Sequence, residues 1–208
     1  MKKTLMFFLF CFGLLGSQGA GAVEPNYRLD PAHSTIGFVA VKNGHVEVPG
    51  VFKKVAGEFR SSKTDQGERL EGGFVTVDIS SLQTPNNPVR DQNIRNTFFE
   101  ISKNPEWTQA QFSLKTPISK IALGAGKPSQ EVTLQGTLSL HGRGISLKVP
   151  VLIAREGKKI VVKNQGTMTL PFARWDLKKA VKNLMKVCGH KTLQDSATLN
   201  FKLVFKPI

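Results

Sequence analysis

Histidine, cysteine, methionine and carboxylate side chains are the groups through which this chain could bind a metal or catalyse a reaction. Its four histidines are too far apart in the sequence to form a local metal-binding pattern: His33, His45, His141 and His190. Met185, Cys188 and His190 form a compact group of the soft ligands that Cu(I) prefers. A core methionine and cysteine beside a surface histidine is the simpler interpretation, so we expect no metal site.

The motifs of the common enzyme classes are missing from the sequence. It contains no Gly-x-Ser-x-Gly nucleophile elbow, no His-Glu-x-x-His helix and no glycine-rich phosphate loop. Asp91 with Arg90 and Arg95 has the residue types of an active-site pair, but an ion-paired helix explains the three residues equally well. We therefore expect a protein that is not an enzyme and uses no cofactor.

The first 22 residues have the pattern of an export signal. Lys2-Lys3 gives a positive start, and Leu5–Leu15 is an apolar run. Ala20–Ala22 supplies the small residues for cleavage before Val23. The apolar run is shorter than the ~20 residues that cross a bilayer. The sequence predicts a signal peptide at 1–22, one domain at 23–208 and a soluble protein in the bacterial periplasm.

The mature chain is strongly basic and nearly free of cysteine. Without the leader it has 27 basic and 15 acidic residues, a net charge of +12. Such a charge suits anionic partners. The basic residues are scattered through expected strands and lack the interleaved aromatic residues of single-strand nucleic-acid binders, so we expect no nucleic-acid partner. Cys188 alone survives cleavage, which excludes an intramolecular disulfide.

Alternating apolar and polar residues dominate the chain. Segments 132–140 and 145–153 alternate on either side of the turn His141–Gly144, which predicts a β-hairpin. Pro150 has no N–H, so we expect it on an outward bulge or a sheet edge. Other strands are expected at 34–41, 52–60, 70–79, 109–114, 159–170 and 197–205. About eight short antiparallel strands predict an all-β sandwich or closed barrel.

Two short helices are expected beside the strands. Asn87 followed by Pro88 predicts an N-cap and a first helical residue, with the helix running to about Asn96. From Asp176 to Cys188 the apolar residues recur at the spacing of an amphipathic helix, which Gly189 would end. Its other face is basic and carries Lys178, Lys179, Lys182 and Lys186.

This basic helix has two interpretations. With Trp175 before it, the helix could rest on anionic membrane lipid while a ligand enters or leaves. In the simpler alternative, the apolar stripe packs on the barrel and the lysines are merely solvated.

An ordered set of short motifs resembles the YceI-like family. It opens with Asp30-x-x-His33-Ser34-x-Ile36-x-Phe38, Gly50-x-Phe52 and Gly57-x-Phe59, and continues with Ser81-Leu82-x-Thr84, Arg90-Asp91, Ile94-Arg95 and Phe98-Phe99. Pro105, Phe112 and Gly136-x-Leu138-x-Leu140-His141-Gly142 complete the set, which spans Tyr27 to Ile153. The chain departs from the family pattern at Asn43 and Gln83, and its basic helix is not part of that pattern.

The resemblance implies a lipocalin-like, antiparallel eight-stranded barrel with one or two short helices. It also implies that a polyisoprenoid, an isoprenoid quinone or a fatty-acid derivative binds in a long internal pocket. Arg90 and Asp91 would fix the first helix over the barrel mouth. The match to the family's apolar positions predicts these ligand-binding residues: Phe38, Phe52, Phe59, Ile94, Phe98, Phe99, Phe112, Leu138 and Leu140.

Three functions are compatible with these observations. The first is a non-catalytic periplasmic protein that binds, transports or stores a long-chain apolar lipid. The second is an enzyme that modifies or isomerises such a lipid. The third is a basic stress or adhesion module whose barrel is packed solid, since a barrel of eight strands is just wide enough to be filled or to hold one slender ligand.

Overall fold

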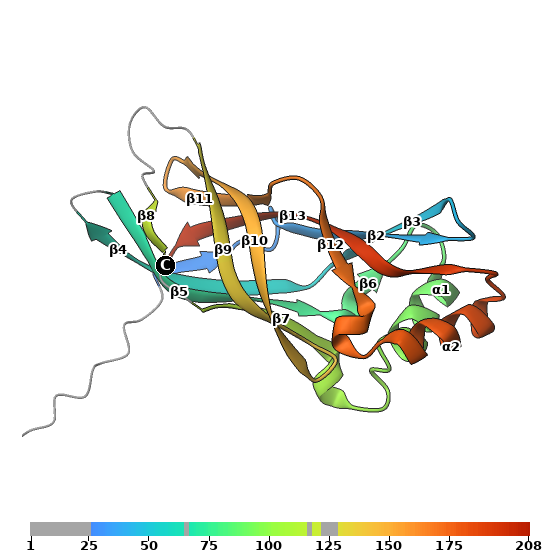
Figure 1. Ribbon diagram of the computed structural model, residues 1–208. Helices are drawn as coiled ribbons and strands as arrows, with labels where there is room; N and C mark the ends of the chain where they lie inside the picture. Colours follow the sequence, from blue (N-terminus) through green and yellow to red (C-terminus); the bar gives the residue numbers. More distant parts are fainter. Residues whose placement is uncertain (1–25, 65–66, 116–117, 122–128) are drawn as a thin grey trace, which may run out of the picture.

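The computed structural model describes residues 26–64, 67–115, 118–121 and 129–208. The expected signal peptide at 1–22 lies outside the described residues. The two termini of the described chain lie at one end of the molecule, and both α-helices lie at the other (Figure 1). We call these the strand end and the helical end.

Eight antiparallel strands form a closed barrel, as the sequence predicts. Neighbouring strands pair in the order β1-β4-β5-β7-β9-β10-β11-β13, and pairing of β1 with β13 closes the ring. Their bounds are β1 Tyr27–Leu29, β4 Val55–Thr64, β5 Gly67–Asp78, β7 Gln109–Leu114, β9 Ser129–Leu140, β10 Arg143–Glu156, β11 Lys159–Asn164 and β13 Leu193–Pro207.

The long strand β13 lengthens the barrel toward the helical end. Its last residues pair with β1 and β11, and its first residues pair with β2 and β12. Beyond β2, the wall continues through β3 to β6. The short strand β8 pairs with β5. The bounds of these strands are β2 Thr35–Lys42, β3 Val46–Phe52, β6 Leu82–Gln83, β8 Ile118–Ile121 and β12 Met168–Pro171.

Two of the expected strands are interrupted. The segment 159–170 is divided into β11 and β12, because Asn164 donates to the carbonyl of Gly166 at 2.7 Å and Gly166 has a positive φ of 66°. The segment 52–60 is divided as well: Phe52 ends β3, and β4 begins at Val55. Both breaks fall where the chain passes from one part of the wall to another.

The predicted hairpin is present with a tighter turn than expected. Leu140 pairs with Arg143, so the turn is only His141-Gly142, with φ of 50° and 73°. Two positive φ angles match the twist of the flanking strands. Pro150 pairs with Thr133 without a bulge. Its carbonyl accepts from the Gln165 amide at 3.0 Å, just beyond the end of β11. The backbone N of Pro150 points the same way as this carbonyl, so the missing N–H falls where β11 has already ended.

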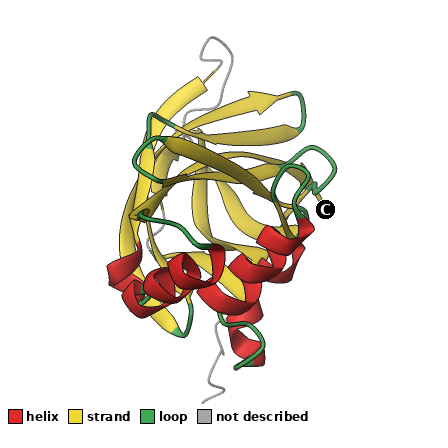
Figure 2. Ribbon diagram, turned by 90° about the vertical axis from the view of Figure 1, so that its right-hand side faces the viewer, coloured by secondary structure: helices red, strands yellow, loops and turns green. Residues whose placement is uncertain are grey.

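The helices gather at the helical end (Figure 2). Helix α1 (Pro88–Asn93) begins at the predicted cap, where Asn87 Oδ1 accepts from the Arg90 amide at 2.8 Å, and continues as the π-helical turn η2 (Ile94–Phe98). Helix α2 (Lys178–Cys188) starts two residues later than expected, because Asp176 has a φ of 62°. Gly189 ends α2 at a φ of 64°, as predicted. Short 3-10 turns are η1 Ile79–Ser81, η3 Pro105–Thr108 and η4 Phe172–Trp175.

Candidate functional site: an apolar cavity inside the barrel

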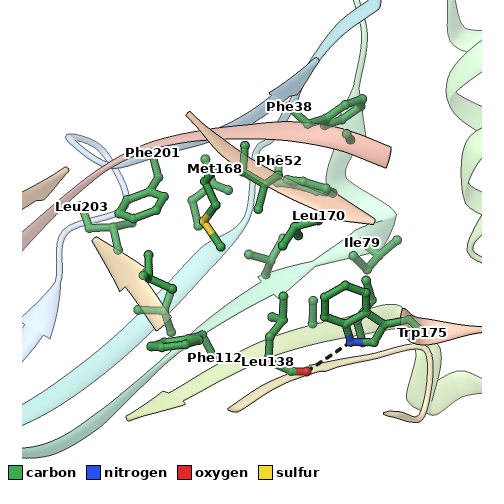
Figure 3. Close-up of a pocket in the computed structure, with 18 of the residues that line it drawn as sticks. Phe38, Phe52, Ile79, Phe112, Leu138, Met168, Leu170, Trp175, Phe201 and Leu203 are labelled. Carbon is green, nitrogen blue, oxygen red and sulfur yellow. Dashed lines mark hydrogen bonds between the residues drawn. The ribbon is translucent and has the colours of Figure 1, made fainter. Parts of the chain in front are cut away.

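A cavity of about 280 Å³ runs inside the barrel from the strand end to the helices. Its wall is made almost entirely of aliphatic and aromatic side chains from the strands, as Figure 3 shows for Phe52, Met168 and Phe201. The volume is near the lower limit of small-molecule pockets, which span about 300–1,000 Å³. Such a space suits a slender apolar molecule.

Two glycines help to keep the interior open. A Cβ atom on Gly50 would lie 2.3 Å from the ring of Phe38, and one on Gly136 would lie 2.3 Å from the ring of Phe112. Each ring therefore occupies the space that a side chain on the neighbouring strand would fill. Larger side chains at these positions would force both rings into the lumen.

Three aromatic rings close the strand end of the cavity. Tyr27 stacks on Phe59 with ring centroids 4.6 Å apart, and Phe59 meets Phe205 edge-on at 4.8 Å. All three are buried. Beside them Asp30 Oδ2 contacts Lys206 Nζ at 2.6 Å and His33 Nδ1 at 2.7 Å, tying β1 to the end of β13. This end is a packed floor.

Trp175 is the central residue of the helical end. Its side chain is completely buried, and its Nε1 donates to the Leu138 carbonyl at 3.2 Å (Figure 3). A buried indole N–H needs such a partner. Trp175 therefore belongs to the core, and its own side chain does not reach the surface.

The apolar stripe of α2 also packs inward. Ala180, Val181 and Leu184 are buried, and Leu184 and Cys188 line the cavity. At the adjoining corner Phe98 meets Phe99 and Phe172 edge-on, each at 4.8 Å. The stripe thus packs on the barrel, as the simpler interpretation of this helix requires, while the four lysines of α2 are exposed.

Asp91 and Arg90 hold α1 in place, although they do so separately. The buried Asp91 carboxylate accepts from the Thr84 amide at 2.8 Å and from the Thr84 hydroxyl. Arg90 Nε donates to that hydroxyl, and Arg95 donates to the Ser80 carbonyl at 2.9 Å. The ion-paired helix considered from the sequence is therefore wrong. Arg90 also lines the cavity.

Five ionisable groups lie in the cavity wall. They are Lys42, Glu58, Arg90, Cys188 and His190, and they come from different elements. Burial lowers the pKa of His190, and the nearby Lys42 charge lowers it further, which favours the neutral imidazole. Among the described residues no cluster of three or more histidine, cysteine or carboxylate side chains is placed to bind a metal ion.

Asn43, one of the two departures from the family pattern, has a structural role. It has a positive φ of 50° in the β2–β3 turn, and its Oδ1 accepts from the amides of Lys191 and Thr192 at 3.0 and 3.4 Å. Asn43 N also donates to the Thr192 carbonyl at 2.9 Å. The side chain thus fixes the segment between α2 and β13. Gln83 is exposed at the end of β6 and makes no comparable contact with the residues that the structure describes.

The structure brings all nine sequence-predicted residues to the cavity wall: Phe38, Phe52, Phe59, Ile94, Phe98, Phe99, Phe112, Leu138 and Leu140. Sequence reasoning missed the contribution of the carboxyl-terminal part, where the wall includes Met168, Leu170, Phe172, Trp175, Leu184 and Phe201. The alternation of the last strand and the apolar stripe of α2 already placed two of these residues, Phe201 and Leu184, on apolar faces. The motif match ends at Ile153, so it could not identify them.

Comparisons with known proteins agree with this architecture. Residues 27–205 match the model of the YceI-like domain. A comparison with curated proteins returned no match. No helix within the described residues is long and apolar enough to span a lipid bilayer.

Several solved structures share the fold. A polyisoprenoid-binding domain from Saccharophagus degradans, implicated in plant cell wall breakdown, is 20% identical with a TM-score of 0.75, covering 89% of this chain and 100% of its own. Burkholderia cenocepacia BcnA is 20% identical with a TM-score of 0.61, and the match covers 85% of this chain and 98% of BcnA. A Campylobacter jejuni YceI protein is 18% identical with a TM-score of 0.54, and the match covers 74% of this chain and 82% of that protein. With the family match over almost the whole described chain, the protein belongs to the YceI-like domain family.

Proposed function

We propose that this protein binds the hydrocarbon chain of a lipid in its barrel and carries or stores it in the periplasm without altering it. The observation that carries the proposal is the apolar cavity between the Phe59–Phe205 pair and Trp175. The polyisoprenoid-binding domain of similar fold supports an isoprenoid or acyl chain as the ligand. The nine predicted wall residues would contact that chain.

Burial supplies the binding energy in this proposal. Each methylene removed from water contributes ~0.8 kcal/mol, which corresponds to roughly a four-fold gain in affinity. Association costs and chain ordering offset part of the total. Affinity should therefore rise with chain length until the cavity is full and then level off.

A homologous series of alkyl alcohols tests this directly. Dissociation constants are measured by displacement of a fluorescent alkyl probe, and the expected plot of affinity against chain length is a rise followed by a plateau. Chain-length-independent affinity would reject the proposal. In parallel, gently purified protein is extracted with organic solvent and analysed by mass spectrometry, where a stoichiometric long-chain lipid is expected.

A pair of tryptophan substitutions on one strand gives a matched control. Leu134 lines the cavity, and the adjacent Gln135 is exposed on the outer face of β9. Leu134→Trp should fill the lumen and abolish probe binding, while Gln135→Trp should leave it unchanged. Equal probe binding by both variants would place the ligand outside the barrel.

The location and the absence of catalysis have separate tests. Cell fractionation should place the protein in the periplasm, and sequencing of its first residues should begin at Val23. Incubation with the extracted lipid should return that lipid unaltered. Turnover would instead support a lipid-modifying enzyme, and repeated absence of any lipid together with no probe binding would support a packed basic module.

A further inference from the structure

Helix α2 presents a continuous basic face at the helical end. Lys178, Lys179, Lys182 and Lys186 are all exposed, and none forms an ion pair with a carboxylate of the described residues. The chain contains no aspartate or glutamate from Leu177 to Gln194. The nearest upstream carboxylate, Asp176, is paired with Arg143 at 3.0 Å. We call the four lysines the α2 basic face.

The opposite face of the same helix covers the cavity. Leu184 and Cys188 line the cavity from α2, and the fully buried Leu177 and Trp175 anchor its start. Viewed from the helical end, the helices lie along one side of the barrel (Figure 2). One helix therefore faces the cavity on one side and presents only positive charge to solvent on the other.

Exposed apolar side chains accompany this charge. Val187 in α2 is 58% exposed and Val89 in α1 is 65% exposed, which places them among the most exposed large apolar residues of the described chain. Val187 directly follows Lys186, so an exposed apolar side chain borders the α2 basic face, and an apolar group in that position can enter the head-group layer of an anionic membrane. Because the buried stripe of α2 faces the barrel, the four lysines supply most of the attraction expected at such a surface, and the exposed valines add to it.

We propose that the α2 basic face docks the protein onto an anionic phospholipid bilayer, with Val187 and Val89 entering the head-group region. This orientation presents the helical end of the cavity to the membrane. Each lysine held near an anionic membrane surface contributes about a five-fold gain in affinity. The docking itself does not depend on the ligand, and only its use for lipid transfer rests on the proposed function.

Vesicle sedimentation tests the docking with two matched quadruple variants. The first changes Lys178, Lys179, Lys182 and Lys186 to Glu. The second changes Lys148, Lys158, Lys163 and Lys202 to Glu; these are exposed lysines of β10, β11, β13 and the turn between β10 and β11, and they too lack an ion pair with described carboxylates. Both variants lose the same net charge, so they differ only in where the charge is lost.

The expected results separate a specific surface from general attraction. Wild-type protein should bind phosphatidylglycerol-containing vesicles and leave pure phosphatidylcholine vesicles unbound. The α2 variant should lose affinity by about 100-fold or more, and the strand variant by only a few-fold. Equal losses in the two variants would overturn the proposal, as would wild-type protein that ignores anionic vesicles. The corresponding Lys→Gln variants, which add no negative charge, should show the same ranking if a Glu variant fails to fold.

Two further measurements fix the orientation and the partner. A Val187→Trp variant should be quenched by brominated lipid, whereas Ile208→Trp, at a 64% exposed position at the strand end, should not. Quenching at both positions or at neither would contradict the docked orientation. A soluble polyanion that binds as tightly as vesicles, with the same α2 dependence, would reject the bilayer as partner.

Cavity binding by the α2 variant distinguishes this inference from the proposed function. Its affinity for the fluorescent alkyl probe should equal that of the wild type, because none of the four lysines lines the cavity. Loss of vesicle binding with intact probe binding supports docking. Normal vesicle binding with no probe binding by the wild type would remove the proposed function and leave the docking in place.

Discussion

The two ends of the barrel close the same cavity by different means. At the strand end, Tyr27, Phe59 and Phe205 pack ring against ring, and the buried Asp30 joins β1 to β13. At the helical end, separate elements meet around Trp175, and backbone turns such as η4 and η2 bring them there. The strand end is part of the sheet itself, whereas the helical end is an added layer over an open ring.

This difference indicates where the molecule can tolerate change. Residues at the strand end stabilise the pairing that closes the barrel, so their loss should affect the whole fold. Residues of the helical layer contact the sheet through side chains, so their loss should first loosen α2 and η4. The following predictions test that division, beginning with the largest effect.

Removing the Phe59 ring should give the largest loss of stability. Phe59→Ala deletes a buried ring that contacts both Tyr27 and Phe205. We expect the free energy of unfolding to fall by about 3–5 kcal/mol, measured by urea denaturation. Hydrogen exchange should accelerate throughout the barrel. A loss confined to β1 would show that this aromatic group does not stabilise the ring as a whole.

Filling the space over a wall glycine should cost less and reduce the cavity. In Gly136→Ala the new Cβ would lie 2.3 Å from the Phe112 ring and 2.5 Å from the Ser113 carbonyl oxygen, so both the ring and the neighbouring strand must shift. We expect a destabilisation of about 1–3 kcal/mol and weaker binding of the longer alkyl chains. Gly72→Ala is the control, because its new Cβ meets no atom closer than 3.4 Å. Unchanged chain-length dependence in Gly136→Ala would contradict the function we assign to the glycine.

Loss of the Trp175 hydrogen bond should affect the helical end alone. Trp175→Phe keeps an aromatic ring but removes the donor to the Leu138 carbonyl. Leaving a buried acceptor unpaired costs about 1–3 kcal/mol. Amide exchange should accelerate in α2 and η4 while β1 and the end of β13 keep their protection. Equal acceleration at both ends would break the distinction between a sheet-built floor and an added layer.

The smallest effects should appear on acidification. The Lys206 ammonium, with help from His33, holds the pKa of Asp30 below its usual value although burial opposes this shift. A carboxylate with a lowered pKa contributes stability above its unfolded pKa and loses it as the pH falls through the folded value. Asp30→Asn should therefore flatten the fall in melting temperature below about pH 4. A pH profile identical to that of the wild type would show that the Asp30 pairing adds no pH-dependent stability.

Glu100 provides the equivalent test at the helical end. Burial raises the pKa of Glu100, but Lys103 and His141 together outweigh burial and lower it. Glu100 has a positive φ of 52°, so Glu100→Gln retains the backbone cost and removes only the charge. We expect the same direction of change as for Asp30, with local exchange near η3 as the readout.

Much of the architecture was predictable because local patterns report it. The alternation in 132–140 and 145–153 predicted the β9–β10 hairpin, and the apolar spacing after Asp176 predicted the buried face of α2. The Asn87-Pro88 pair predicted the start of α1. These signals depend on the period of a strand or helix and on capping chemistry, which act over a few residues.

Other features depend on partners that are distant in sequence. No residue near Asn43 in the sequence indicates that its side chain binds the amides of Lys191 and Thr192. The residues around Asp91 likewise do not indicate that its partner is Thr84, and not an arginine. The interruption between β11 and β12 likewise depends on Asn164, which accepts from the Phe201 amide at 2.9 Å. The contacts of Asn43 and Asn164 form only when the barrel brings remote segments together, whereas Thr84 lies 7 residues before Asp91 and depends on the local path of the chain into α1.

Periodicity and side-chain type by themselves determined an all-β fold, the two helices and the apolar character of the inward residues, and the family resemblance favoured a barrel over a sandwich. Only the tertiary structure decided that the interior is hollow. A phenylalanine such as Phe38 or Phe112 has the same side-chain chemistry whether it fills a lumen or lines it. Here Gly50 and Gly136 on neighbouring strands leave room for the two rings beside the wall. Packing is a property of volumes that meet in three dimensions, so no single segment of the chain contains that information.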